Sequence, residues 1–165
     1  MIEIKTDRLI LKKPKTKQDK ISLVSQIGDW EVVKWLANAP YPYTDDDLED
    51  YLLISDSNQF DLNIFMGKQL IGRVGLTLDG DNYYDLGYWI GKDYWGKGYA
   101  TESSKKLLEY VLDQLDSPKI KSGYFVGNSA SGNVLKKLGF KEVGVEKRYS
   151  VSNKKEMDLM LVVLS

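Results

Sequence analysis

The segment GYWIGKDYWGKGYATESS, residues 87–104, constrains the fold more than any other part of the sequence. An aromatic and apolar run ends there in a cluster of glycines and continues almost at once as a helical pattern. A strand that enters a helix through such a turn directs several free backbone N–H groups, and the positive end of the helix dipole, to one place. Gly96 and Gly98 have no Cβ to hold a bulky anion away, and Lys97 between them adds positive charge. The segment therefore predicts a phosphate-binding turn at a strand-to-helix junction.

Two nucleotide-binding motifs match this turn only in part. The P-loop pattern G-x-x-x-x-G-K-[ST] fits Gly91, Gly96 and Lys97, but Gly98 stands where Ser or Thr would bind magnesium. The dinucleotide pattern G-x-G-x-x-G fits Gly96 and Gly98, but Thr101 stands where the third glycine belongs. The strands before the turn have an antiparallel pattern, which argues against both motifs.

Composition narrows the chemistry that this turn can serve. With 165 residues, 42% of them hydrophobic, the chain suits one domain over residues 1–165 with one core. The net charge is -1 and the Lys and Arg residues are spread along the chain, so we expect no nucleic acid partner. The apolar runs are short and charges interrupt the first of them, so we expect a cytoplasmic protein that does not enter a membrane.

Cysteine and histidine are both absent from the sequence. Their absence excludes Ser-His and Cys-His catalytic arrangements and nearly every zinc site, so we expect no metal centre. Any catalysis has to use carboxylates, hydroxyls and backbone amides.

The first third of the chain has a mostly helical pattern. Residues Thr6–Lys13 predict a strand that ends at a proline, and amphipathic spacing predicts helices at Lys17–Ile27 and Asp29–Ala37. The sequence PYPY at residues 40–43 predicts a turn. Thr44 then predicts the N-cap of a helix with an acidic first turn, which the helix dipole favours.

The rest of the chain predicts an α+β domain with a mostly antiparallel, mixed sheet. The period of the apolar residues changes after Asp61, and turn sequences separate the strands that follow. We expect the strand after the central helix to lie parallel to the strand before it. The predicted elements are strands at 62–66, 70–78 and 83–90, a central helix up to Ser117, a strand at 120–126, a short helix within 128–140, and a hairpin of 141–151 with 156–164.

These elements and two motifs resemble the GNAT superfamily of acetyl-CoA-dependent N-acetyltransferases. The superfamily's pyrophosphate loop, [QR]-x-x-G-x-[GA], fits residues 95–100 at both small positions, with Trp95 at the first position. A second motif, N-x-x-S-x-x-V-x-x-K-x-G-F, fits residues 128–140. The opening TDRLIL and the segment Pro42-Tyr43-Thr44 are similar to the RimJ/RimL branch, which acetylates ribosomal-protein N-termini. The resemblance covers nearly the whole chain.

The resemblance implies a single GNAT-like domain whose sheet splays between its fourth and fifth strands, with acetyl-CoA bound in the gap. An amine would attack the acetyl carbonyl directly in a ternary complex, and a backbone N–H near Trp89 or Ile90 would stabilise the oxyanion. The implied cofactor-binding residues are Tyr88, Trp89, Ile90, Trp95, Gly96, Lys97, Gly98, Tyr99, Ala100, Thr101, Asn128 and Ser131.

The implied proton-transfer groups depart from the usual superfamily pattern. Asp85 stands where many members carry a glutamate, so it is our candidate base. Glu102 or water could be the base instead, and Asp85 would then be only a solvated strand residue. The tyrosine that often protonates the CoA thiolate is replaced by Leu135. Ser131 remains as a candidate acid, although a serine there can equally cap the helix, and Asn128 can equally serve a turn.

The amine acceptor is the least specified part of this interpretation. Four aromatic residues, which can equally be core residues, are candidates for lining its site: Trp30, Trp35, Tyr41 and Tyr43. The acceptor is a protein N-terminal α-amine or a small-molecule amine, and the choice between monomer and homodimer stays open. The alternatives to an enzyme of this kind are a non-catalytic acyl-CoA binding or sensing module and, less favoured, a phosphate-binding NTPase.

Overall fold

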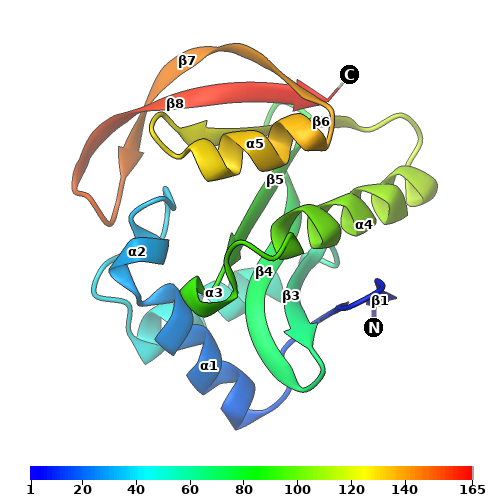
Figure 1. The fold of residues 1–165 in the computed structure, drawn as a ribbon, viewed down its shortest axis with the longest axis vertical. Coiled ribbons are helices and arrows are strands. Elements are labelled where there is room, and N and C mark those ends of the chain that lie inside the picture. Colours follow the sequence, from blue (N-terminus) through cyan, green and yellow to red (C-terminus); the bar gives the residue numbers. More distant parts are fainter. Residues whose placement is uncertain (165) are drawn as a thin grey trace.

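A mixed sheet carries the fold, and the strand that leads into the glycine-rich turn lies near its centre. The computed structural model describes residues 1–164, so Ser165, the last residue of the predicted domain, lies outside it. In residues 1–164 eight strands pair in the order β1-β2-β3-β4-β5-β6-β8-β7 (Figure 1). The strands are β1 Glu3–Lys5, β2 Ile10–Lys12, β3 Asp61–Met66, β4 Gln69–Leu78, β5 Tyr83–Ile90, β6 Lys119–Phe125, β7 Phe140–Ser150 and β8 Lys155–Leu164.

The helices lie between the strands in the predicted order. The first three come before the β3–β4–β5 meander, and the longest follows the glycine-rich turn. Figure 1 shows the β7–β8 hairpin with α5 on one side of the molecule, and α1 to α3 with the β3–β4 hairpin on the other. The helices are α1 Lys17–Ile27, α2 Trp30–Val33, α3 Asp45–Ser55, α4 Tyr99–Gln114 and α5 Ser129–Lys137, with a 3-10 helix η1 at Lys92–Tyr94.

All strand pairs are antiparallel except β5 with β6, which are parallel. The parallel register joins Tyr83 to Lys119 and Asp85 to Lys121, and among the described residues it ends there. Beyond Asp85 the two strands diverge, while β5 stays paired with β4 as far as Ile90. The predicted α+β class, the parallel return and the splay between these two strands are confirmed.

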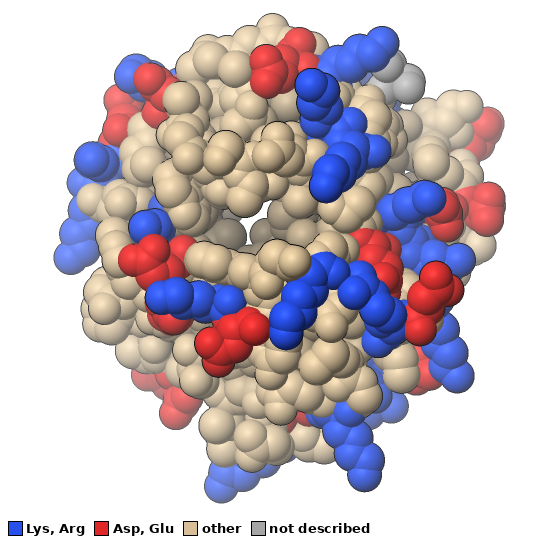
Figure 2. Space-filling view, viewed as in Figure 1, with Lys and Arg blue, Asp and Glu red and all other residues tan. Residues whose placement is uncertain are grey.

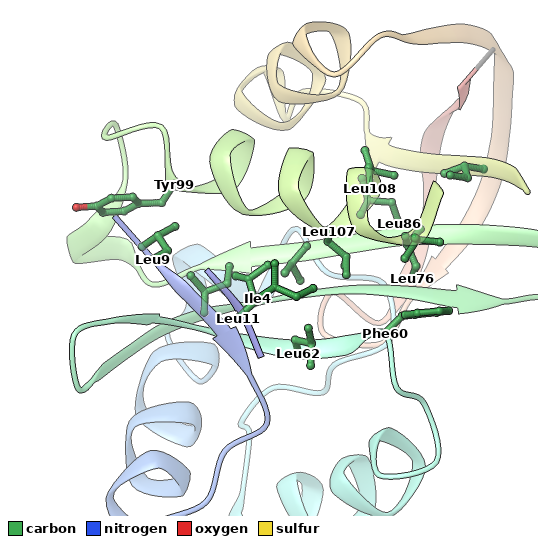
Figure 3. Close-up of a cluster of buried hydrophobic side chains, with 14 of the residues drawn as sticks. Ile4, Leu9, Leu11, Phe60, Leu62, Leu76, Leu86, Tyr99, Leu107 and Leu108 are labelled. Carbon is green, nitrogen blue, oxygen red and sulfur yellow. The ribbon is translucent and has the colours of Figure 1, made fainter. Parts of the chain in front are cut away.

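The two faces of β5 serve different cores, because alternate side chains of a strand point to opposite faces. Leu86 and Ile90 belong to the cluster that packs against α4, where Leu107 is fully buried. Figure 3 shows Leu107 and Leu108 of α4 lying over this face of the sheet. Trp89, on the opposite face, belongs to a second cluster with residues of α1 and α3. The glycine-rich turn thus joins a strand and a helix that are held together by a buried core.

Two of the predicted elements are wrong in extent. The first predicted strand, Thr6–Lys13, is replaced by β1 and β2, which pair with each other around a turn. Thr6 makes this turn, because its backbone N–H donates to the Leu9 carbonyl at 2.9 Å and its Oγ1 accepts from the Leu9 N–H at 2.9 Å. A side chain that bonds to nearby backbone in this way competes with strand pairing.

The second predicted helix, Asp29–Ala37, is only the four residues of α2. Its predicted C-terminal part is bound instead by the β7–β8 turn, where the Val151 N–H donates to the Ala37 carbonyl at 2.9 Å. The Asn153 side chain also donates to the Lys34 carbonyl at 2.8 Å. These long-range bonds could not be seen from local helical spacing.

Helix caps and the chain reversals follow the sequence closely. Thr44 caps α3 as predicted, and it forms a reciprocal capping box with Asp47. The final hairpin turns at residues 151–154, one residue earlier than the predicted turn at 152–155. None of the helices within residues 1–164 is long and apolar enough to span a membrane.

Candidate functional site

The glycine-rich turn holds two residues in a conformation that side chains disfavour. Gly96 and Gly98 have φ angles of 74° and 79°, in the left-handed region, and Gly98 is the N-cap of α4. The first backbone N–H groups of a helix have no partner within the helix, and here they belong to Tyr99, Ala100 and Thr101. The turn therefore presents a row of donors at the positive end of a sixteen-residue helix. This geometry suits a phosphate group.

The aromatic residues of the turn have separate tasks. The Trp95 indole Nε1 donates to the Ile90 carbonyl at 2.7 Å, and 45% of Trp95 is exposed. Tyr99 is buried, and its hydroxyl contacts the Met66 sulfur at 3.2 Å. Tyr99 can therefore offer only its backbone to a ligand in the turn, whereas the Trp95 ring covers the end of β5.

The N-terminal segment is tied to the start of α4 through Glu102. This carboxylate accepts a hydrogen bond from Thr6 Oγ1 at 2.6 Å and one from Arg8 Nε at 2.8 Å. Burial raises the pKa of Glu102, but the donors Thr6 and Arg8 lower it more, so its net shift is downward. The Arg8 guanidinium lies over the Tyr99 ring, 4.5 Å from its centre. A carboxylate committed to these donors is poorly suited to be a base, which favours Asp85 over Glu102.

A cavity of about 1230 Å³ runs along the gap between β5 and β6. Figure 2 shows it as an opening near the middle of this face, with both positive and negative side chains near its rim. Side chains of both faces of β5 line it, so the cavity connects the two faces of the sheet. The predicted site residues that line it are Asp85, Tyr88, Trp89, Ile90, Trp95, Gly96, Gly98, Tyr99, Ala100, Thr101, Asn128, Ser131, Trp35 and Tyr43.

The backbone of β5 beyond Asp85 offers hydrogen-bonding groups to this cavity. The odd-numbered residues at both ends of β5 form hydrogen bonds with the β4 side. The N–H of Gly91, directly after β5, donates to the Ile71 carbonyl, and the N–H of Asp79, directly after β4, donates to the Tyr83 carbonyl, each at 2.8 Å. Because backbone groups alternate along a strand, those of Tyr88 and Ile90 face the gap, and the Trp89 N–H faces β4.

Asp85 lies where β5 and β6 begin to diverge. It is the last residue of β5 in the parallel register, and it lines the cavity. Burial raises the pKa of Asp85, although Lys121 and Arg148 act against the shift. Lys121 itself forms an ion pair with Asp79. A partly desolvated carboxylate in this position can accept a proton at a higher pH than an ordinary aspartate.

The hydroxyl of Ser131 lies against the hydroxyl of Tyr88. The two oxygens are 2.8 Å apart, and Tyr88 also donates to the Ser131 carbonyl at 3.2 Å. Burial raises the pKa of Tyr88 to about 12, so the phenol is neutral at physiological pH. The cap of α5 is Asn128, whose Oδ1 accepts from the Ser131 N–H at 3.4 Å. The interpretation of Ser131 as the helix cap is therefore wrong.

The sequence profile of a family described as "Acetyltransferase (GNAT) domain" matches residues 8–141. The chain belongs to the GNAT family. Membership confirms the predicted enzyme class, an acetyltransferase, and with it acetyl-CoA, the acetyl donor of the family. The splayed pair β5 and β6 and the turn before α4 correspond to the fold that the resemblance implied.

Relatives of this GNAT domain are similar over most of its length. An uncharacterized N-acetyltransferase, p20 of Bacillus licheniformis, is 26% identical over 167 residues, covering 96% of this chain and 93% of p20. YdaF of Bacillus subtilis, provisionally named a ribosomal N-acetyltransferase, is 30% identical over 119 residues, covering 67% of this chain and 65% of YdaF. The solved structure of RimL, a ribosomal L7/L12 α-N-protein acetyltransferase in complex with coenzyme A, shares the fold, with a TM-score of 0.80, 18% identity and coverage of 98% and 97%.

The structure does not bring all of the predicted site residues to the cavity. Lys97, Trp30 and Tyr41 are not among the described residues that line it. Trp30 and Tyr41 instead pack edge to face, with ring centres 5.0 Å apart. Trp35 and Tyr43 do line it, and Tyr43 packs against the cluster of Trp89, on the face of β5 that carries Asp85. Within residues 1–164 no cluster of acidic side chains is arranged to hold a metal ion.

Sequence reasoning missed three polar side chains of the site. The sequence pattern points to the backbone of Tyr88 and gives no sign that its hydroxyl meets Ser131, 43 residues away. Arg8 lies next to the turn, with Nη2 3.5 Å from the place where a Cβ on Gly98 would stand, and only the fold brings them together. Arg73 lines the cavity from β4. Its signal in the sequence is a charged residue between two glycines, Gly72 and Gly75, inside an apolar strand.

Proposed function

We propose that this GNAT domain transfers the acetyl group of acetyl-CoA to a primary amine by direct attack in a ternary complex. The acceptor is a protein N-terminal α-amine or a small-molecule amine. The observation that carries the proposal is the cavity along the β5–β6 gap, which opens to both faces of the sheet. A donor bound at the glycine-rich turn and an amine arriving from the Asp85 face meet in that gap. The provisional name of YdaF and the name of RimL favour a protein N-terminus.

The donor side has the chemistry that acetyl-CoA needs. The N–H groups of Gly98 to Thr101 would bind the pyrophosphate, and Lys97 and Arg8 would add positive charge at the turn. The backbone groups of Tyr88 that face the gap, together with the Asn128 amide, would pair with the pantetheine arm, while the Ile90 carbonyl already accepts from Trp95. Acetyl-CoA supplies an acyl group activated as a thioester, so the protein has to position it and to handle protons.

The amine side requires one proton acceptor. An α-amine has a pKa near 8, so a fraction of it is already unprotonated at neutral pH. Asp85 would accept, through a water molecule, the proton that the amine has to lose. The raised pKa of this carboxylate favours its role as a proton acceptor. The Ile90 N–H, which faces the gap, would stabilise the oxyanion that forms as nitrogen attacks the carbonyl.

The leaving thiolate requires one proton donor. Ser131 would donate its hydroxyl proton to the sulfur, Tyr88 would pass its own proton to Ser131 through the contact of 2.8 Å between their oxygens, and water would return a proton to the Tyr88 phenolate. The pair thus takes the place of the tyrosine that Leu135 replaces. This assignment uses a neutral phenol, in agreement with a Tyr88 pKa of about 12.

Turnover with a panel of amines tests the proposal. Acetyl-CoA is mixed with peptides of varied first residue and with small amines, and both released CoA and acetylated product are measured. We expect one acetylated amine per CoA released and a rise in melting temperature with acetyl-CoA. Stabilisation by acetyl-CoA with no product from any amine would indicate the non-catalytic acyl-CoA module instead. Stabilisation by ATP with magnesium alone would indicate a nucleotide-binding protein.

A further inference from the structure

A buried hydrogen-bonded group lies under the amine side of the cavity. Arg73 of β4 donates from Nε to Asp61 Oδ1 at 2.6 Å and to the Tyr51 hydroxyl at 2.8 Å. The Tyr51 hydroxyl in turn donates to Asp61 Oδ2 at 2.5 Å. Only 5% of the Asp61 side chain is exposed. One edge of the guanidinium is therefore fixed by a buried carboxylate and a phenol.

The other edge of the guanidinium is free. Neither Nη1 nor Nη2 of Arg73 forms a hydrogen bond with a residue in the described part of the chain, and 20% of the side chain is exposed. Arg73 lines the cavity, and its Nη1 lies 3.2 Å from the place where a Cβ on Gly87, another lining residue, would stand, so this edge lies on the cavity side. Arginine stays protonated at all relevant pH values and presents its donors as a rigid, planar fork.

Two glycines make room for this fork. Gly75 of β4 and Gly87 of β5 face each other in the sheet register. A Cβ on Gly75 would lie 2.7 Å from Arg73 Nη2, and a Cβ on Gly87 would lie 3.2 Å from Nη1. The guanidinium therefore lies across two strands over positions where any side chain would crowd it. A glycine inside a strand often marks such a close approach.

We propose that the amine acceptor carries a carboxylate, which binds the free edge of Arg73. This inference rests on the proposed acetyl transfer and names the class of acceptor for the same site. A carboxylate matches the fork with two parallel hydrogen bonds. An acceptor without an anion would leave these N–H groups unpaired when it displaces water from the cavity, at a cost in affinity.

The charges around Arg73 favour a carboxylate over a phosphate. Asp61 already neutralises the guanidinium, so the pair has little net charge with which to attract a dianion. Asp47 and Asp50 of α3 also line the cavity and repel a second negative charge. This set of residues therefore suits a single carboxylate, which is bound by directional hydrogen bonds more than by net electrostatic attraction.

The positions of Arg73 and Asp85 also fit an acceptor that carries an amine and a carboxylate close together. Gly87, beneath the guanidinium, and Asp85 lie two residues apart on one face of β5, which separates them by roughly 6.6 Å along the strand. An amine at Asp85 and a carboxylate at Arg73 are thus neighbours. Two kinds of acceptor have this chemistry: a free amino acid or related aminocarboxylate, and a peptide that begins with Asp or Glu.

Matched acceptor pairs test the inference. Each free amino acid is compared with its amide, and peptides that begin with Asp or Glu are compared with the same peptides that begin with Asn or Gln. Rates are expressed per unprotonated amine. The wild-type kcat/KM should favour the carboxylate member by roughly tenfold to a hundredfold, the effect of hydrogen bonds to a charged group. The arm in which the preference is found, free or peptide, identifies the source of the carboxylate.

Two variants assign the preference to Arg73. Arg73→Lys keeps the charge but loses the fork, and Gly87→Ala covers Nη1 while it leaves the ion pair with Asp61 intact. Both should reduce the ratio of the two kcat/KM values to less than about threefold, whatever change they make in the absolute rates, with the affinity for acetyl-CoA retained. The control is Gly144→Ala, the same change on β7, where no atom outside the adjacent residues lies within 4 Å of the new Cβ. It should keep the wild-type preference.

A binding measurement separates this inference from the proposed function. Calorimetric titration of the same pairs into the protein with CoA detects carboxylate binding without any turnover. Binding that depends on the carboxylate and on Arg73, with no acetylation, would remove the proposed function and leave the anion site in place. Acetylation with equal use of both members of every pair, or a preference that survives both variants, would overturn the inference. If neither kcat/KM nor the binding affinity favours the carboxylate member of any pair, the inference is also overturned.

Discussion

Ser131 shows how one contact decides between two roles of a serine at the start of a helix. Its hydroxyl lies 2.8 Å from the Tyr88 hydroxyl, and the backbone donor at the helix start is satisfied by Asn128 instead. Ser131→Ala should therefore lower kcat by roughly tenfold or more, because it removes a proton donor to the leaving thiolate. The free energy of unfolding should fall by only about 0.5–1.5 kcal/mol, the contribution of the lost hydrogen bond to Tyr88, since no helix cap is lost.

Tyr88→Phe is the matched variant for this pair of hydroxyls. It should lower kcat in the same direction and leave the Kd of acetyl-CoA near the wild-type value, because the pair acts on charge that develops during the reaction. Steady-state kinetics and urea unfolding on the same preparations provide the check. A fully active Ser131→Ala protein would remove Ser131 from the mechanism.

The raised pKa of Asp85 should make the stability of the protein depend on pH. Burial raises its pKa in the folded protein above the unfolded value of about 3.9, so the folded state binds this proton more tightly. The stability that the bound proton contributes is present below pH 3.9 and is lost as pH rises through the folded pKa. Asp85→Asn cannot titrate, so it should gain stability relative to the wild type as pH rises from 4 to 8.

The same substitution should reduce catalysis. If Asp85 accepts the amine proton, Asp85→Asn lowers kcat/KM by roughly a hundredfold, in the range typical of general bases. Unfolding midpoints at a series of pH values, with rates measured alongside, test both effects. A stability difference that does not vary with pH would show that the carboxylate is not desolvated.

At the scale of elements, the junction of β5 and α4 depends on the left-handed residue at its centre. Gly98 has a φ of 79°, a conformation that Asp and Asn tolerate better than most residues. Gly98→Asp should therefore fold, with a cost of roughly 1 kcal/mol, and lose acetyl-CoA binding, because its carboxylate stands where the pyrophosphate belongs.

Gly98→Asn is the control for the size of the side chain, since it is neutral and nearly isosteric with Asp. It should bind acetyl-CoA more tightly than Gly98→Asp. Thermal shift with increasing acetyl-CoA measures both variants. An unchanged affinity in Gly98→Asp would mean that the phosphate binds elsewhere.

The β7–β8 turn supports the wall of the amine side. Its Asn153 amide donates to the Lys34 carbonyl at 2.8 Å, and Ser152 Oγ donates to the Val33 carbonyl at 3.1 Å, next to the lining residue Trp35. Asn153→Ala should loosen this wall and raise the KM of the amine about threefold to tenfold, with the Kd of acetyl-CoA unchanged. Lys155→Ala, an exposed change on the same hairpin, is the control. Equal effects on the two substrates would argue against a local role.

For the whole molecule, the order of elements could be predicted from the sequence because each signal is local. The alternation of β3 to β5, the helical spacing of α4 and the caps depend on neighbours a few residues away. The parallel return of β6 followed from the element order. The true extent of α2 did not, because hydrogen bonds from residues 151 to 153 hold the carbonyls that a longer helix would have used.

The candidate site also has parts that the local sequence predicts and parts that only the fold brings together. The turn at Gly96 and Gly98 was visible because glycine, charge and a helix start occur together in one segment. The pairing of Tyr88 with Ser131, and of Arg73 with Asp61, joins residues far apart in the chain. Their meeting depends on how β5 splays from β6 and on the register of β4 with β3, which no local pattern records.

The central claim is that donor and amine meet in one cavity and that no acyl group passes through the protein. Initial rates measured while both acetyl-CoA and the best amine of the panel are varied test it most directly. Double-reciprocal plots should give intersecting lines, and acetyl-CoA without amine should release no burst of CoA. Parallel lines, with one CoA released per protein molecule before any amine is added, would show an acyl-enzyme and contradict direct transfer.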